Sequence, residues 1–359
     1  MANTIPLEVK RHCVELAESG TPNRAIYQDY FAKQFDEPAK YAGFRRMLHK
    51  WKSRAMADRS TLEAGTYEGF IAHGATVQVS AKGEIVQAWV KQHAGSVDPI
   101  EFIEAIRGTV PAYEYQLQID GSASRMLEIP LFDMHWGINY LEHYERVLCE
   151  ILELISSRHW AQIVIPFGQD FFHNDSIVNG QTTKGIQIEK VDMQRAVKEG
   201  QQFVYAIVDA ALANSNSVRV LYTPGNHDRS VSWMFMQVLL ERYGSEIVDD
   251  SLEYRKAFAY GANVVMVTHG DSKQATPKNL AHIFPIAFPE MFAEATIREV
   301  HSGHLHYESE ADIYGVMVRR LSSGSQIDEW SDKEDYVGTH RRFMLFEWGL
   351  DKLKSIHYI

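Results

Sequence analysis

The chain has 359 residues, 45% hydrophobic and 23% charged, so it is long enough to bury a large core and two domains are expected. Its formal net charge of −11 argues against a protein that coats nucleic acid, because neutralising phosphates takes Lys and Arg. No run approaches the roughly 20 apolar residues of a membrane span, and the N-terminus lacks the basic-then-apolar order of a signal peptide. These features predict a cytoplasmic protein that does not contact membranes.

The cysteine content indicates the redox compartment, and the histidine content indicates a metal site. Cys13 and Cys149 lie far apart in segments with helical spacing, so no disulfide framework is expected and a reducing compartment is favoured. Histidine is abundant, with 16 residues, and several stand beside Asp, Asn or Gly. This distribution is the first indication of a metal site.

The first 60 residues differ in charge from the rest of the chain. They hold 11 Lys and Arg against 7 Asp and Glu, a net of +4, which leaves −15 for the remainder. Apolar spacing predicts three helices, over Leu7–Ser19, Asn23–Phe35 and Tyr41–Met56. A basic last helix in a trihelical unit is compatible with a helix-turn-helix DNA-binding module. A small helical docking domain with a solvated charged face is the alternative.

Residues 61–120 are predicted to connect this helical domain, residues 1–60, to a catalytic domain over residues 121–359. Within the connector, alternating residues predict a hairpin over Ala75–Val79 and Glu84–Val90. A short helix is expected over Pro99–Arg107. We expect little independent chemistry from this part of the chain.

Beyond the connector, short apolar runs alternate with helices. The predicted strands are Met126–Phe132, Ile163–Phe167, Val218–Tyr222, Val264–Thr268, Ile297–Val300, Val316–Leu321 and Phe343–Glu347. The predicted helices are Tyr140–Ser156, Met193–Ala213 and Ser232–Tyr243. Continuous apolar strands between helices indicate an α/β core whose sheet is covered on both faces, and the later strands would suit a second sheet packed on the first.

Five of these strands are followed, at once or within a few residues, by side chains of the kinds that bind metals. The segments that follow them are Asp133-Met134-His135, Gly168-Gln169-Asp170, Gly225-Asn226-His227-Asp228, His269-Gly270-Asp271 and Gly303-His304-Leu305-His306. Sites assemble at the carboxyl ends of strands in α/β sheets, so these groups can converge.

The residue types fit a pair of cations. Two cations about 3.5 to 4 Å apart polarise a phosphoryl oxygen, lower the pKa of a shared water and stabilise entering and leaving oxygens. Holding them so close takes a bridging anion, which one carboxylate such as Asp170 supplies. Mixed imidazole and carboxylate ligands suit Mn, Fe or Zn better than Ca or Mg.

These motifs resemble those of the calcineurin-like metallophosphoesterases, whose signature runs Asp-x-His, Gly-Asp, Gly-Asn-His-Asp/Glu, His, Gly-His-x-His. The resemblance covers residues 126–349. It implies a four-layer sandwich of two mixed sheets flanked by helices, which here follows a small all-α domain. It also implies a hydrolase with two divalent metal ions, for which we expect Mn, with Fe or Zn as alternatives.

The resemblance further implies a role for each matching residue. One metal would be held by Asp133, His135, Asp170 and His306, and the other by Asp170, Asn226, His269 and His304. His227 would be the acid that protonates the leaving oxygen or stabilises the transition state, and Asp228 would orient it.

One motif departs from the family pattern, because Gln169 separates Gly168 from Asp170. Either Asp170 or Asp175 could then be the bridging carboxylate, and we expect Asp170. Phe171-Phe172-His173 follows it, which resembles the exonuclease subunit of the double-strand-break repair complex. That branch implies a place for His173 near the scissile phosphate, while a surface-loop histidine is the alternative.

The predicted function is therefore a Mn-dependent DNA exonuclease or endonuclease that uses a metal-bridging water as nucleophile. A phosphatase or phosphodiesterase for nucleotides or phosphoproteins is one alternative, and a non-catalytic DNA-binding scaffold is another. Relatives among the nucleases also imply a possible homodimer. Trp136, beside His135, would either stack on a base or close the core.

Overall fold

The structure is a computed structural model that describes residue 5 and residues 7–34, 41–49, 51, 70–79, 85–94, 99–326 and 340–359. Its contacts divide the chain into two compact units, Met1–Ser96 and Val97–Ile359. Among the described residues, no helix is both long and apolar enough to cross a membrane. The cytoplasmic location and the three-part domain division stay predictions.

The first unit begins with the three expected helical segments. They are α1 (Leu7–Glu18), then α2 (Asn23–Ala25) continued by η1 (Ile26–Tyr30) and η2 (Phe31–Gln34), and a helix over residues 41–49. Buried Cys13, Phe31 and Phe44 pack together, one from each segment. The predicted helices are confirmed over Leu7–Glu18 and over residues 23–34 and 41–49, while Phe35, Lys50 and the end of the third helix beyond residue 51 lie outside the described residues. The burial of Cys13 raises the pKa of its thiol to about 11.

The predicted hairpin is also present in the first unit. Strands β1 (Phe70–Val79) and β2 (Ile85–Ala94) pair antiparallel, with Phe70 opposite Ala94. Both strands are longer than their apolar alternation predicts. The expected helix appears in the second unit as α4 (Pro99–Ile106), which lies next to α7 (Arg229–Tyr243).

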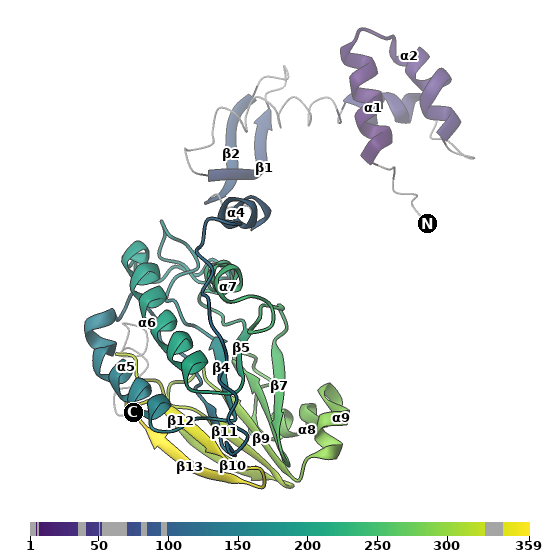
Figure 1. Cartoon of the computed structure of the whole chain (residues 1–359). Helices are drawn as coiled ribbons and strands as arrows, with labels where there is room; N and C mark the ends of the chain where they lie inside the picture. Colours follow the sequence, from purple (N-terminus) through teal and green to yellow (C-terminus); the bar gives the residue numbers. More distant parts are fainter. Residues whose placement is uncertain are drawn as a thin grey trace. The chain divides into compact units, whose positions relative to one another are not determined.

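The second unit contains two mixed sheets (Figure 1). The six-stranded sheet has the order β13 (Leu353–Tyr358), β12 (Met344–Trp348), β3 (Met126–Glu128), β4 (Gln162–Gly168), β5 (Val218–Thr223), β6 (Val248–Asp249). The five-stranded sheet has the order β10 (Ser309–Ile313), β11 (Val316–Arg320), β9 (Ile297–Ser302), β8 (Asn263–Thr268), β7 (Arg255–Tyr260). Strands β3 to β6 are parallel, as are β8, β9 and β11.

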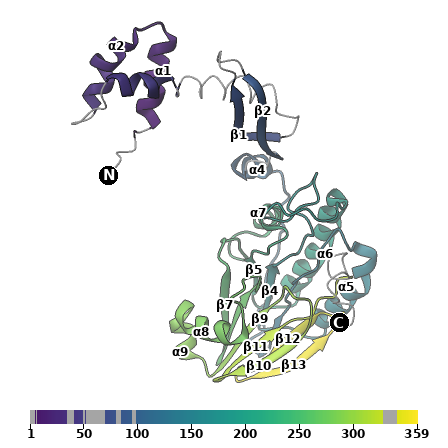
Figure 2. The ribbon, with the colours of Figure 1, turned by 180° about the vertical axis from the view of Figure 1, so that it is seen from behind.

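Helices cover the outer face of each sheet. The six-stranded sheet carries α5 (Leu141–Ser156), α6 (Met193–Ala213) and α7, and the five-stranded sheet carries α8 (Pro277–Ala287) and α9 (Pro289–Glu294). Figure 2 shows α8 and α9 on the opposite side of the sheets from α5 and α6. The predicted four-layer sandwich is therefore confirmed.

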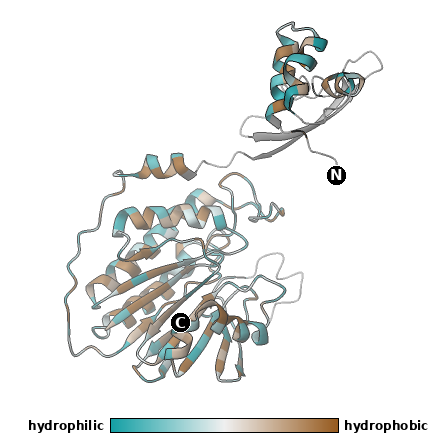
Figure 3. Cartoon of the chain, turned by 90° about the vertical axis from the view of Figure 1, so that its right-hand side faces the viewer, coloured by the Kyte–Doolittle hydropathy of each residue, from teal (hydrophilic) through white to brown (hydrophobic). Residues whose placement is uncertain are grey.

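Because successive side chains of a strand point to opposite faces of the sheet, the continuous apolar strands fill three separate cores. Ile163 and Ile165 face α6, whereas Val164 between them faces the second sheet. In β8, Val265 meets that same central core and Val264 faces α8. The sheet strands are accordingly largely brown in Figure 3, because both of their faces are buried.

Two features of the sheets differ from the sequence prediction. Strand β3 ends at Glu128 rather than at Phe132, because Pro130 has no N–H for the ladder; Ile129 and Leu131 still donate to β4. Strands β6, β7, β10 and β13 were not predicted. All four are edge strands, whose exposed faces break the apolar run.

Candidate metal centre

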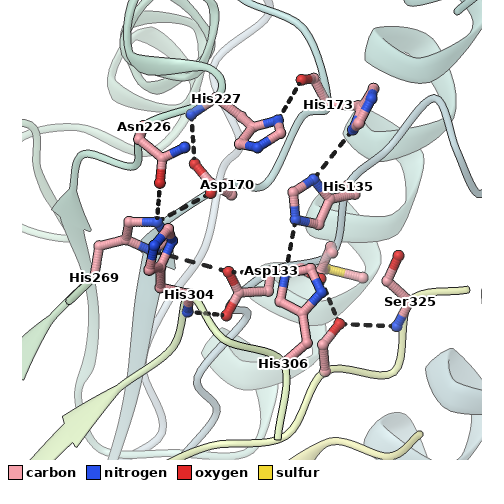
Figure 4. A network of polar contacts seen from close by, with 12 residues as sticks. Asp133, His135, Asp170, His173, Asn226, His227, His269, His304, His306 and Ser325 are labelled. Carbon is pink, nitrogen blue, oxygen red and sulfur yellow. Dashed lines mark hydrogen bonds and ion pairs between the residues drawn. The ribbon is translucent and has the colours of Figure 1, made fainter. Parts of the chain in front are cut away.

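The seven predicted ligands meet at one edge of the two sheets. The carboxyl ends of parallel β3, β4 and β5 lie at the same edge of the first sheet, and those of β8 and β9 lie together in the second. Figure 4 shows the side chains that these ends carry around a common centre: Asp133, His135, Asp170, Asn226, His269, His304 and His306.

Their ligand atoms form two adjoining groups. One consists of Asp133, His135 and His306, the other of Asp170, His269 and His304, and within each group all ligand atoms lie within 4.8 Å of one another. His269 joins the groups, with Nε2 3.0 Å from Asp170 Oδ2 and Nδ1 3.9 Å from Asp133 Oδ1. Asn226 Oδ1 lies 2.9 Å from His269 Nε2. Each group could hold one metal ion.

The two carboxylates are held in the same way. The backbone N–H of His227 donates to Asp170 Oδ1 over 2.7 Å, and the backbone N–H of His304 donates to Asp133 Oδ2 over 2.7 Å. Each carboxylate therefore has one oxygen fixed by a loop of the chain. The other oxygen of each, Asp170 Oδ2 and Asp133 Oδ1, is the one that faces the histidines.

Two glycines make this close approach possible. A Cβ on Gly225 would lie 2.1 Å from Asp170 Oδ1, and a Cβ on Gly303 would lie 2.1 Å from Asp133 Oδ2. Any side chain at either position would displace the carboxylate or the loop. The glycines of the third and fifth motifs are thus required by the positions of the carboxylates.

Backbone strain is concentrated at the centre. Seven described non-glycine residues have positive φ angles: Asp133, His135, Gln169, Asp170, His304, His306 and Tyr314. Only Tyr314, in the turn between β10 and β11, lies outside the motifs. Left-handed conformations of such residues cost about 1 to 3 kcal/mol each and persist where function requires them. Five of the seven are predicted metal ligands, which favours a functional site.

The unsatisfied polar atoms of the centre fit a cation. Asp133 Oδ1 and His269 Nδ1 are buried without a hydrogen-bond partner. Buried polar atoms left in this state are costly, and coordination of a divalent cation would satisfy them.

Electrostatics favour the protonation states that metals need at His135, His304 and Asp170, whereas His269 without a metal gains a proton. Burial lowers the pKa of His135 well below its ordinary value, and burial together with His269 lowers the pKa of His304 to about 4. Burial alone would raise the pKa of Asp170 and lower that of His269. Their mutual attraction prevails, so the pKa of Asp170 falls and that of His269 rises to about 9. A protonated His269 then supplies the positive charge between two carboxylates that a cation would otherwise provide.

His227 and His173 lie beside the first group. His227 Nδ1 is 3.0 Å from the carbonyl oxygen of His173, so this nitrogen carries the proton and donates. The ring of His173 is buried, with Nδ1 3.3 Å from His135 Nδ1 and Nε2 3.7 Å from Glu189 Oε1. The surface-loop alternative for His173 is therefore wrong.

The position of Asp228 corrects one expectation. Its Oδ2 accepts the backbone N–H of Phe172 over 2.8 Å, and its Oδ1 has no hydrogen-bond partner. Burial and then Asp170 raise the pKa of this carboxyl well above its ordinary value. The group that orients His227 is thus the carbonyl of His173, while Asp228 fixes the segment that carries this carbonyl.

Asp175, the alternative bridging carboxylate, lies elsewhere. Its Oδ1 accepts the backbone N–H groups of Ser230 and Val231, at 2.6 and 3.0 Å, at the start of α7. Its task is to cap this helix. Asp170 is the carboxylate that lies among the predicted ligands, and its bridging role stays a prediction.

Comparison with known proteins gives remote structural matches. No family model matches the chain, and no curated protein matches it. Each of three solved structures covers 66% of this chain. Vps29 of Entamoeba histolytica complexed with Zn²⁺ is 13% identical, with 98% of its chain covered and a TM-score of 0.31.

The other two structures are similarly distant. An archaeal phosphodiesterase is 10% identical, with 99% covered and a TM-score of 0.34. A predicted phosphoesterase of Streptococcus pneumoniae is 11% identical, with 88% covered and a TM-score of 0.28. Because all three TM-scores lie below 0.5, these matches carry no argument about activity.

Two supporting residues were not predicted from the sequence. Ser323 Oγ donates to the carbonyl of Asp133 over 2.6 Å and fixes the strained turn there. Gln169, the inserted residue of the second motif, is buried, and its Nε2 donates to Thr223 Oγ1 over 2.6 Å. The insertion therefore ties the end of β4 to that of β5. The run of small residues after β11, Ser322-Ser323-Gly324-Ser325, was the feature of the sequence that could have indicated a role for Ser323.

Proposed function

We propose that this chain is a two-metal-dependent phosphodiester hydrolase that acts on DNA. The observation that carries the proposal is the meeting of two groups of imidazole and carboxylate ligands, linked through His269 and Asp170, with His227 beside them. Two divalent cations held there would polarise a phosphoryl oxygen and lower the pKa of the attacking water. Mn is the cation we expect, with Fe and Zn as alternatives.

The chain's own residues prepare the reaction in two ways. The backbone N–H groups of His227 and His304 fix the carboxylates of Asp170 and Asp133 before substrate arrives, so little reorganisation is needed during the reaction. The strained turns that carry them hold the ligand directions against relaxation. This is the preorganisation that hydrolysis of a stable diester requires.

His227 is proposed to move the proton. Its Nδ1–H is committed to the carbonyl of His173, so Nε2 is the nitrogen left to act on substrate. When water attacks phosphorus and the bond to the leaving oxygen breaks, the protonated His227 would donate the Nε2 proton to that oxygen. His173 acts through its carbonyl, which sets the direction of the His227 ring.

The front segment supports DNA as the substrate. Arg45 and Arg46 are exposed on the helix over residues 41–49, whose Phe44 and Leu48 are buried. A basic helix face on a small trihelical unit is typical of modules that contact phosphates. The net charge of −15 in the remaining residues favours a small phosphoester instead, so DNA and a small diester must be compared directly.

The decisive assay compares end-labelled duplex and single-stranded DNA with bis(p-nitrophenyl) phosphate, in Mn²⁺, Mg²⁺, Zn²⁺ or chelator. We expect hydrolysis of all three substrates in Mn²⁺ and none with chelator. His227→Ala should lower kcat on the two DNA substrates by about 100- to 10,000-fold, the usual contribution of a positioned general acid, because the sugar oxygen that leaves needs a proton. It should still bind Mn²⁺ in calorimetry, because His227 is placed outside the metal ligands. The exposed His282 supplies the control variant His282→Ala.

Two outcomes would contradict the proposal. If His227→Ala cleaves as fast as the wild type, the proton-transfer role of His227 is wrong. If bis(p-nitrophenyl) phosphate is hydrolysed while both DNA substrates survive, the chain is a phosphodiesterase for small esters and the DNA assignment fails. An inactive protein that binds two Mn²⁺ ions would favour the scaffold alternative.

A further inference from the structure

An exposed tyrosine lies at the rim of the metal centre and is not part of its ligand set. Tyr254 immediately precedes β7, and the pairing of Arg255 with Thr268 places it opposite His269. The carbonyl of Tyr254 accepts Thr268 Oγ1 over 3.0 Å, which fixes its backbone there. Tyr254 is 50% exposed.

The same tyrosine is held from the other sheet. Arg229 Nη1 donates to the Tyr254 hydroxyl over 2.6 Å, and the guanidinium carbon lies 4.9 Å from the centre of the ring. Arg229 follows Asn226 by three residues and His227 by two. The pair therefore spans from the loop after β5 to the start of β7, at the edge where Asn226 and His269 stand.

The loop before α6 holds this arrangement in place. The backbone N–H of Arg229 donates to Thr183 Oγ1 over 3.1 Å, and the backbone N–H of Thr183 donates to the carbonyl of Asn226 over 3.1 Å. Thr183 thus ties the Arg229 backbone to the metal-ligand segment. Arg229 and Tyr254 are therefore held in fixed positions, and the Tyr254 ring does not have to move to contact a ligand.

Three other aromatic side chains near the centre cannot serve this purpose. Trp136, Phe171 and Phe172 are fully buried and pack against α6 and α7. Trp136 therefore closes the core, and the alternative that it stacks on a base is wrong. Tyr254 offers a ring to solvent beside a permanently charged guanidinium, a combination that suits a planar base joined to a phosphate.

We propose that Tyr254, positioned by Arg229, is a platform on which the nucleobase next to the scissile phosphate stacks. The inference rests on the proposed phosphodiesterase function and adds its substrate class, which is diesters that carry a nucleoside. Arg229 meets the phosphate or the edge of the base. Stacking tolerates any base, so the platform predicts preference for nucleosides without preference for sequence.

The test uses two diesters with the same leaving group, thymidine 5′-(p-nitrophenyl phosphate) and methyl p-nitrophenyl phosphate, with full-length protein and saturating Mn²⁺. Tyr254→Ala should lower kcat/KM for the nucleoside diester by roughly 10-fold or more, the loss typical of one base–aromatic stack. The methyl diester should be hydrolysed at an unchanged rate. Tyr254→Phe keeps the ring and should retain most of the preference.

Tyr314→Ala is the matched control, since Tyr314 is 93% exposed and lies in the turn between β10 and β11. It should change neither substrate. Equal loss on both diesters, or no loss on either, with Tyr254→Ala would overturn the platform while leaving the hydrolase intact. If the wild type hydrolyses neither diester in Mn²⁺, Mg²⁺ or Zn²⁺, the proposed function is wrong and so is the platform that rests on it.

Discussion

Two buried clusters of histidine and carboxylate lie along the same strands and differ in whether their polar atoms have hydrogen-bond partners. In the first, Glu128 of β3 and Glu299 of β9 flank His301, whose ring nitrogens lie 2.7 and 3.2 Å from their oxygens. Arg319 Nε donates to Glu299, and Trp348 Nε1 donates to Glu128. Both nitrogens of His301 are therefore satisfied.

In the metal centre, a few residues further along β3 and β9, the partners are incomplete. Asp133 Oδ1 and His269 Nδ1 lack hydrogen-bond partners, and the backbone at Asp133 and His304 is strained. His301, by contrast, lies in ordinary strand. A saturated polar cluster, in which every polar atom has a partner, stabilises the contact between the sheets. An unsaturated cluster, in which partners are missing and the backbone is strained, is prepared for ligands.

Removing a partner from the saturated cluster gives the largest expected effect on stability. Glu128→Ala leaves the nitrogen of His301 and the indole N–H of Trp348 without their acceptor. We expect a loss of about 3 to 5 kcal/mol in the free energy of unfolding, measured by urea denaturation with chelator. Activity per folded molecule in Mn²⁺ should not change.

Glu347→Ala is the control for this variant. Glu347 lies on β12 and is itself buried, but its partners Arg125 and Arg158 are 35% and 46% exposed at their side chains. Its loss should cost at most about 1 kcal/mol, as for pairs that water screens. If Glu128→Ala abolishes Mn²⁺ binding but leaves stability unchanged, the two clusters do not differ in the proposed way.

A matched pair of aspartates tests the unsaturated cluster. Asp170→Ala should lower kcat by about 100- to 1,000-fold, because a preorganised charge at the reacting centre is lost. Mn²⁺ should also no longer raise its melting temperature, whereas it does so for the wild type. Asp175→Ala removes only the cap of α7 and should cost about 1 kcal/mol of stability with activity retained. The reverse pattern would make Asp175 the functional carboxylate.

The sequence predicted the centre of the fold better than its edges. Strands buried on both faces, such as β4 and β8, appear as continuous apolar runs, and their ends carried the motifs. The edge strand β10 alternates partly exposed and exposed residues, and β13 is partly exposed up to its last residue, which is exposed, so neither gives such a run. Pairing to a neighbour, which the sequence pattern does not contain, makes them strands.

The site was predicted in its side chains but not in its backbone. Residue types and order suffice to propose the ligands, because strand ends converge in any α/β sheet. The carbonyl of His173 as the partner of His227, and the support of Asp133 by Ser323, depend on backbone atoms. Every residue has a carbonyl, so no residue type marks one that is used. The role given to Asp228 was wrong for this reason.

The pH dependence of stability offers the smallest and sharpest test of the comparison. Burial alone would lower the pKa of His301, but the carboxylates of Glu128 and Glu299 raise it to about 9 from 6.5. Because the folded pKa exceeds the unfolded one, the stabilisation is complete below pH 6.5 and disappears as the pH rises through 9. The shift corresponds to about 3 kcal/mol.

We expect the difference in unfolding free energy between wild type and His301→Gln to shrink by that amount between pH 6.5 and 9.5, measured with chelator. Subtraction of the variant cancels the titration of groups outside the cluster, while the cationic side chain of Arg319 stays charged throughout this range. Loss of Glu299, the second carboxylate on His301, should remove part of the same dependence. A difference that stays constant from pH 6.5 to 9.5 would mean that His301 is neutral in the folded protein. His301 would then hold the sheets together by hydrogen bonds alone, and the ion pair between Arg319 and Glu299 would be independent of it.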